Sequence, residues 1–67
     1  MEVKVGRYRH YKGNEYEVIG IAKHSETLEE LVVYKTLYEN ELSNLWVRPV
    51  KMFLDEVNGK KRFEKID

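Results

Sequence analysis

The sequence predicts a mainly β fold in one small domain that spans residues 1–67. Short runs rich in β-branched and aromatic residues alternate with turn signals, and a single late stretch combines a proline with helical spacing. The chain has no Cys, so neither a disulfide nor a thiolate metal site can reinforce its thin core. Five Tyr, two Phe and one Trp must therefore supply much of that core.

The first two predicted strands form a hairpin. Residues 3–11 alternate and contain several aromatic side chains, Gly13 lies in a turn, and residues 15–23 form the returning strand. On the returning strand, alternation places four residues on one face: Tyr16, Val18, Gly20 and Ala22. The small residues in this set suggest a tight bend of the sheet.

The segment that follows permits two interpretations. Residues 31–38 resemble a third strand, because they contain a continuous Val-Val-Tyr run of strand formers. Residues 27–30 also fit a helix capping box, and helical spacing relates Leu28, Leu31, Tyr38, Leu42 and Leu45. The pattern alone leaves helix and strand open over residues 28–45, and we favour the strand because Lys35 interrupts the helical stripe.

The last third of the chain contains the predicted helical turn. A turn over residues 40–44 precedes a short strand at 45–48, and the proline after it suits the start of a helix. Helical spacing predicts an amphipathic turn or two through Val50, Phe53, Leu54 and Val57. Gly59 would stop this helix, and residues 62–66 alternate as the closing strand. Five short strands with one short helical turn before the last describe a small, partly open barrel of the SH3-like kind.

The aromatic residues divide between core and surface. We expect the core to contain Val18, Val32, Phe53 and Phe63, with the rings of Tyr16 and Tyr34. Tyr11 and Tyr38 lie near turns and are candidates for exposed rings. Trp46 permits two roles, a hydrophobic plug or a stacking platform beside Arg48, and we favour the plug.

Charge is unevenly distributed although the net charge is zero. Residues 1–12 contain four basic and one acidic residue, residues 13–45 two and seven, and residues 46–67 six and four. In a barrel of this kind the first and last strands run side by side. The basic ends would then combine into a positive face on Arg7, Arg9, Lys60, Lys61 and Arg62.

Eight short motifs occur in a distinctive order: Tyr8–Gly13, Tyr16–Val18, His24–Thr27, Val32–Tyr34, Leu37–Tyr38, Trp46–Pro49, Met52–Phe53 and Arg62–Phe63. In this order and spacing they resemble a small bacterial family known only as domain of unknown function 1653. The resemblance implies a compact all-β, SH3-like domain that usually stands alone. It implies a fold and no mechanism, because the family has no assigned activity.

Function is best interpreted as binding rather than catalysis. The predicted ligand is anionic: single-stranded nucleic acid, a nucleotide or an acidic peptide. Candidate binding residues supply charge, a stacking ring and polar contacts: Arg9, His10, Lys12, His24, Trp46, Arg48 and Arg62. The sequence pI near 6.7 is low for a dedicated nucleic-acid-binding domain.

Two other classes of function stay open. The basic and acidic faces could meet between proteins, as in a protein-interaction domain or a weak homo-oligomer. A small metal- or His-dependent hydrolase would require His10, His24 and Glu26 to converge. The sequence shows no local ligand pair such as His-x-x-x-His, so we assign no catalytic residue, metal or cofactor.

Two further expectations concern structure and location. Glu26, Glu29 or Glu30 could instead clamp one of three arginines and hold the barrel together: Arg9, Arg48 or Arg62. No apolar run approaches the roughly 20 residues of a membrane span, and the first residues do not resemble a secretory signal. We therefore expect a cytoplasmic protein without membrane contact.

Overall fold

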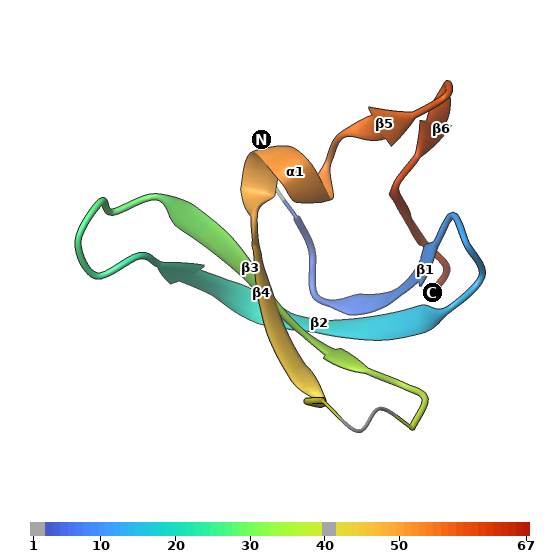
Figure 1. Ribbon diagram of the computed structural model, residues 1–67, viewed down its shortest axis with the longest axis horizontal. Coiled ribbons are helices and arrows are strands. Elements are labelled where there is room, and N and C mark those ends of the chain that lie inside the picture. The colour runs from blue at the N-terminus through green and yellow to red at the C-terminus, as the bar shows by residue number, and fades with distance from the viewer. Residues whose placement is uncertain (1–2, 40–41) are drawn as a thin grey trace.

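The computed structural model describes residues 3–39 and 42–67, and within them the chain forms seven strands and one helix (Figure 1). In chain order these are β1 (Gly6–His10), β2 (Glu15–Lys23), β3 (Glu30–Thr36), β4 (Leu45–Pro49), α1 (Val50–Phe53), β5 (Glu56–Val57), β6 (Lys60–Lys61) and β7 (Phe63–Lys65). Five strands form an antiparallel sheet in the order β4-β3-β2-β1-β7, and β5 and β6 form a separate hairpin. The mainly β class and the helical turn before the last strand are confirmed.

The first and last strands lie side by side, as expected. β1 pairs with β7 so that Tyr8 faces Lys65 and His10 faces Phe63. Beyond this pairing, the Arg7 amide donates a 2.7 Å hydrogen bond to the Asp67 carboxylate. The two ends of the chain are therefore joined by both backbone and side-chain contacts.

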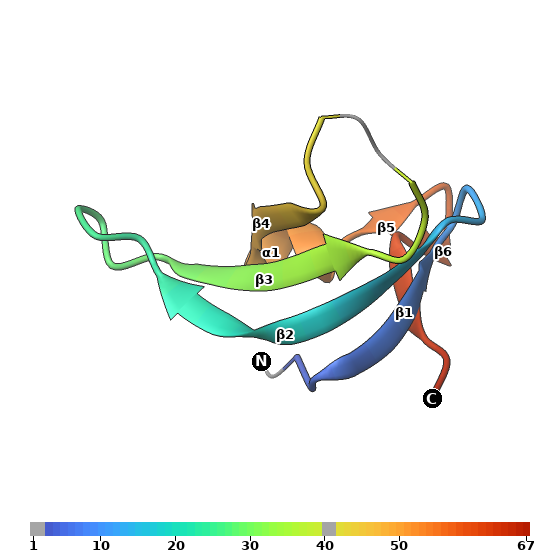
Figure 2. The same cartoon turned by 90° about the horizontal axis from the view of Figure 1, so that it is seen from below.

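The sheet does not close into a barrel. β4 and β7 stand at opposite ends of the strand order, and Figure 2 shows β1 to β4 following one another across the sheet. α1 and the β5–β6 hairpin lie together on one side of β1 and β2 (Figure 1). Phe53 of α1 stacks on Phe63 with ring centroids 4.2 Å apart. Packing of α1, which directly follows β4, against β7 therefore takes the place of the backbone hydrogen bonds of a closed barrel.

The prediction of a helix that extends through Val57 is wrong beyond the first turn. α1 ends at Phe53, and the next residues turn back as the β5–β6 hairpin. Asn58 and Gly59 have φ angles of 53° and 83°, both in the left-handed region that a type I′ hairpin turn requires. The Asn-Gly pair is therefore a hairpin turn and not a helix stop.

β2 contains the expected bend, although its consequence differs from the prediction. Val18 pairs with Tyr34, but the register shifts before Gly20, which pairs with Val33. This β-bulge places Ile19 as an extra residue and reverses the alternation beyond it. The prediction that Gly20 and Ala22 share the face of Val18 is therefore wrong.

The ambiguous middle segment is a strand. β3 begins at Glu30, and Leu28 has a φ of 62°, which a helix does not permit. Thr27 stabilises a tight turn, because its hydroxyl accepts a 3.2 Å hydrogen bond from the Glu29 amide. The predicted turn over residues 40–44 lies partly outside the described residues, because Asn40 and Glu41 are not described.

The core fills the side of the sheet that faces α1, which we call the inner face. Its buried side chains are Val3, Tyr8, Val18, Val32, Tyr34, Phe53 and Phe63. The four predicted core residues are among them, and Tyr16, Trp46 and Val50 pack against the cluster. Tyr11 and Tyr38 are exposed, as predicted. In the part of the chain described here, no helix is long and apolar enough to cross a membrane.

Candidate functional site

The inner face carries a hollow of about 250 Å³ with aromatic walls, which we call the aromatic hollow. It is lined by Tyr16, Tyr34, Tyr38, Leu42, Trp46 and Arg48. Register explains this grouping, since Tyr34 faces Trp46 across β3 and β4, and Arg48 follows two residues later on the same face. The three tyrosines were not among the predicted site residues, because their rings were assigned to core and surface individually.

Arg48 differs from the other three arginines. Arg7 pairs with Asp67 at 3.3 Å, Arg9 with Glu15 at 3.4 Å, and Arg62 with Asp55 at 2.6 Å. Among the described residues, Arg48 has no carboxylate partner.

The guanidinium of Arg48 lies against an aromatic surface. Its central carbon is 5.6 Å from the centroid of the Phe63 ring, a cation–π contact. The Nε atom is buried and has no hydrogen-bond partner within the described residues. A buried donor without a partner costs about 1–3 kcal/mol of stability. Arg48 is therefore held in place without the compensation that a carboxylate would provide.

Asp55 is a carboxylate near enough to Arg48 for the positive charge of Arg48 to lower its pKa. The pKa of Asp55 is lowered first by its hydrogen bond from Arg62 and, to a smaller extent, by the positive charge of Arg48. Both carboxylate oxygens of Asp55 accept from the Arg62 guanidinium, at 2.6 and 3.3 Å. Asp55 is thus committed to Arg62 and does not neutralise Arg48.

The walls of the aromatic hollow are held by hydrogen bonds. The Trp46 indole N–H donates to the Ser43 carbonyl at 3.0 Å, which orients its half-buried ring. The hydroxyls of Tyr16 and Tyr38 are 3.1 Å apart. Burial, followed by this hydrogen bond, raises the pKa of Tyr16 to about 12. The Tyr16 phenol therefore stays protonated and adds no negative charge to the site.

His10 marks the edge of the aromatic hollow, with its ring centroid 6.4 Å from that of Tyr16. Its Nδ1 accepts the Lys12 amide at 3.2 Å, so the neutral ring carries its proton on Nε2. Burial lowers the pKa of His10, and the positive charges of Arg48, Arg62 and Lys12 lower it further. His10 is therefore favoured in its neutral form at the edge of the aromatic hollow, and of the cations that act on it Arg62 is already paired with Asp55.

A second hollow, of about 480 Å³, lies between the β1–β2 turn and the β5–β6 hairpin, and we call it the hairpin hollow. Its lining includes Arg9, His10, Tyr11, Glu56, Lys60 and Lys61. This places Arg9 with the two hairpin lysines, although Arg9 is already paired with Glu15. Arg7 and Arg62, the other members of the predicted positive face, do not line this hollow and are paired with Asp67 and Asp55. His10 belongs to this hollow and adjoins the first one.

His24 lies apart from the other predicted binding residues. It belongs to the β2–β3 loop, which Figure 1 places at the opposite end of the molecule from the β1–β2 turn. Its Nδ1 accepts hydrogen bonds from the Glu26 amide at 3.1 Å and the Thr27 amide at 3.3 Å, so the His24 ring stabilises the turn. The convergence of His10, His24 and Glu26 that a hydrolase would need does not occur. In residues 3–39 and 42–67, no group of three or more His, Cys, Asp or Glu could hold a metal ion.

The predicted ion-pair clamps have different partners from those expected. Glu26, Glu29 and Glu30 form no ion pair with any arginine in the described residues. The observed partners lie across a neighbouring strand or a turn because pairing register brings them opposite, as with Arg9 and Glu15.

Comparison with known proteins agrees with the fold. The family described as "Protein of unknown function (DUF1653)" matches residues 6–65 of the chain. The crystal structure of a DUF1653 protein from Bordetella bronchiseptica superposes with a TM-score of 0.92 at 32% sequence identity, covering 97% of this chain and 88% of that one. No curated protein matches the sequence significantly. The chain therefore belongs to the DUF1653 family of proteins of unknown function.

Proposed function

We propose that the protein is a small binding module that recognises an anionic ligand at the aromatic hollow. The observation that carries this proposal is the Arg48 guanidinium, which lacks a carboxylate partner among the described residues while every other arginine has one. A half-buried cation is costly unless it is paired. An anionic group on a ligand would supply the missing partner through charge-assisted hydrogen bonds.

The surroundings of Arg48 favour an anion that carries a flat ring. Trp46 and Tyr38 line the hollow and offer ring faces on which a planar group can stack. At the edge of the hollow the Nε2–H of His10 adds a donor, and Lys12 adds positive charge that acts on His10. A nucleotide uses both the rings and the charges, whereas an acidic peptide would use only the charges. A cytoplasmic setting, where nucleotides are abundant, forms part of the proposal.

Binding can be tested by nuclear magnetic resonance with thymidine 5′-monophosphate as the probe. We expect shifts in the Arg48 side-chain and Trp46 indole signals, and about tenfold or more weaker binding in Arg48→Gln, because a hydrogen bond to a charged group is lost. Arg7→Gln is the matched control, since it removes an arginine from the opposite face. Equal binding by wild type and Arg48→Gln, or no shift at either signal, would contradict the proposal.

Self-association through the sheet edge is the weaker candidate. The Thr36 amide donates a hydrogen bond to the Asn44 carbonyl, and along β4 every second residue after Asn44 bonds β3 in the same way. The backbone groups of residues 45, 47 and 49 therefore point away from β3, toward the open edge of the sheet. The Ser43 hydroxyl already bonds the Leu45 amide at 3.1 Å and its carbonyl at 2.9 Å, and Pro49 has no amide hydrogen. The edge of β4 is thus protected at Leu45 and Pro49, and Val47 is the residue of this strand that could pair with an added strand.

A further inference from the structure

We infer that the anionic ligand is a short single-stranded nucleic acid whose successive nucleotides occupy the aromatic hollow and the hairpin hollow, with His10 between them. This inference rests on the proposed function and extends it from one hollow to two. It names the ligand as a polymer of ring and phosphate units rather than as a free nucleotide.

The nearness of the two hollows is the first argument. His10 lines the hairpin hollow, and its ring centroid is 6.4 Å from Tyr16, which lines the aromatic hollow. At about 250 Å³, the aromatic hollow is smaller than the roughly 300–1,000 Å³ typical of sites for drug-sized ligands. The adjoining hairpin hollow adds about 480 Å³. A flexible ligand with linked units can fill both, and a single nucleotide can fill one.

The alternation of ring and charge along this path is the second argument. Trp46, Tyr38 and Arg48 line the aromatic hollow, and the His10 ring lies at its edge. Tyr11 follows as an exposed ring whose centroid is 4.6 Å from that of His10.

Further cations accompany Tyr11. The Lys12 ammonium lies 5.8 Å from the centroid of its ring, and Lys60 and Lys61 line the same hollow. Rings for bases and cations for phosphates in alternation are what non-specific single-strand binding requires. A duplex would not use these rings, because its bases are already stacked and paired.

The acidic residues of the hairpin hollow limit the size of the site. Glu56 and Glu64 also line it, as the cross-strand partners of Lys61 and Arg9, so they reduce the positive charge that this hollow offers to phosphates. We therefore expect contacts with two or three phosphates and a shallow salt dependence. For two phosphates, the logarithm of the binding constant should fall with a slope of about −1.4 against the logarithm of salt concentration.

A chain-length series tests the inference. The probes are 5′-phosphorylated oligothymidylates of one to six nucleotides, and fluorescence titration measures their binding affinity. The affinity should rise at least about tenfold from one nucleotide to three, and less than about threefold from three to six. The double variant Lys60→Gln/Lys61→Gln should lose the gain with length and keep the affinity for the mononucleotide within about twofold. Arg48→Gln should weaken every length, and Arg7→Gln should change none.

The outcomes separate this inference from the proposed function. If the mononucleotide binds in an Arg48-dependent manner and longer chains bind no better, the two-hollow inference is overturned and the proposed function stands. Equal binding of a thymidine–adenine duplex, or of an oligoglutamate, also overturns it. If neither mononucleotide nor oligonucleotide binds, both fail. Circular dichroism of each variant establishes that the fold is retained.

Discussion

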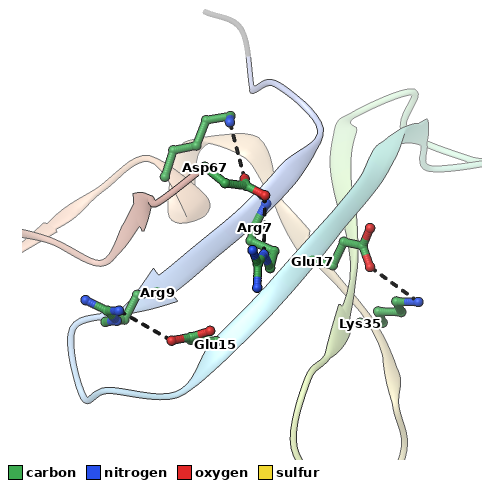
Figure 3. Close-up of polar contacts among 7 residues, drawn as sticks. Arg7, Arg9, Glu15, Glu17, Lys35 and Asp67 are labelled. Carbon is green, nitrogen blue, oxygen red and sulfur yellow. Dashed lines mark hydrogen bonds and ion pairs between the residues drawn. The ribbon is translucent and has the colours of Figure 1, made fainter.

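The two faces of the sheet use arginine in opposite ways. On the outer face, Figure 3 shows Arg7, Arg9 and Lys35 each directed at a carboxylate, in the ion pairs Arg7–Asp67, Arg9–Glu15 and Lys35–Glu17. On the inner face, Arg48 lies against Phe63 and lacks such a partner within the described residues. Exposed pairs of the first kind contribute little to stability. Arg48 lacks even such a pair within the described residues, and the proposed function gives its charge a role.

The largest expected difference between the faces concerns packing. Phe53 is 1% exposed and contacts Phe63, Tyr8 and Tyr34, whereas Ile19 on the outer face is 51% exposed. Phe53→Ala should cost about 3–5 kcal/mol, which approaches the whole stability of so small a domain. Ile19→Ala should cost less than about 1 kcal/mol. Urea denaturation of the two variants measures both, and similar losses would show that the inner face is not the core.

The next difference concerns charge removal on the inner face. Arg48→Met should leave the free energy of unfolding unchanged or raise it by up to about 1 kcal/mol, because it replaces a costly half-buried cation with an apolar side chain. Arg62→Met should lower stability, because it leaves Asp55 without its guanidinium partner. Thermal unfolding compares the two, and a large loss in Arg48→Met would show that Arg48 supports the fold.

A third expectation concerns how the stability contributed by His10 depends on pH. Because burial and three neighbouring cations lower the pKa of His10, the unfolded chain binds a proton more readily than the folded chain. Stability from this group is therefore present above the unfolded pKa of about 6.5 and is lost as pH falls below it.

The cause of the His10 shift can be tested separately by a resonance titration of its ring. Arg48→Gln should raise the pKa of His10 by removing a positive charge, whereas Arg7→Gln should leave it unchanged. A bound anion should raise it too. An unaltered His10 titration in Arg48→Gln would contradict the proposed electrostatic contact.

The smallest effect is expected on the outer face. Lys35→Gln removes an ion pair of 3.3 Å whose two side chains are nearly half exposed. The loss should be about 0.2–1 kcal/mol and should shrink in high salt. A double-mutant cycle with Glu17→Gln isolates the pair, and a coupling well above this range would place this ion pair among the principal stabilising contacts.

Much of the fold could be predicted because it depends on local periodicity. Val32 to Tyr34 formed a strand and Phe53 was recognised as a core residue, since short-range patterns determine which side chains share a face. The errors occurred where backbone geometry has no alternation signal. The bulge at Ile19 reversed the faces of β2, and Asn58-Gly59 made a hairpin where a helix stop was equally compatible with the sequence.

The candidate site residues were selected from the sequence by residue type. Trp46 and Arg48 line the aromatic hollow and His10 lies at its edge, whereas Lys12 and Arg62 line neither hollow. His24 was identified on the same grounds and lies elsewhere, because residue type does not encode position. The spacing of Trp46 and Arg48 on one strand was the signal that their side chains share a wall.

The sequence by itself determined the strands, most of the core and the segregation of charge, because alternation and composition are local properties. Only the tertiary structure decided which cations are neutralised. Pairing register set Arg9 opposite Glu15, and a two-pronged bond committed Asp55 to Arg62. These contacts join residues from separate elements, and together they leave Arg48 facing a ring-lined hollow.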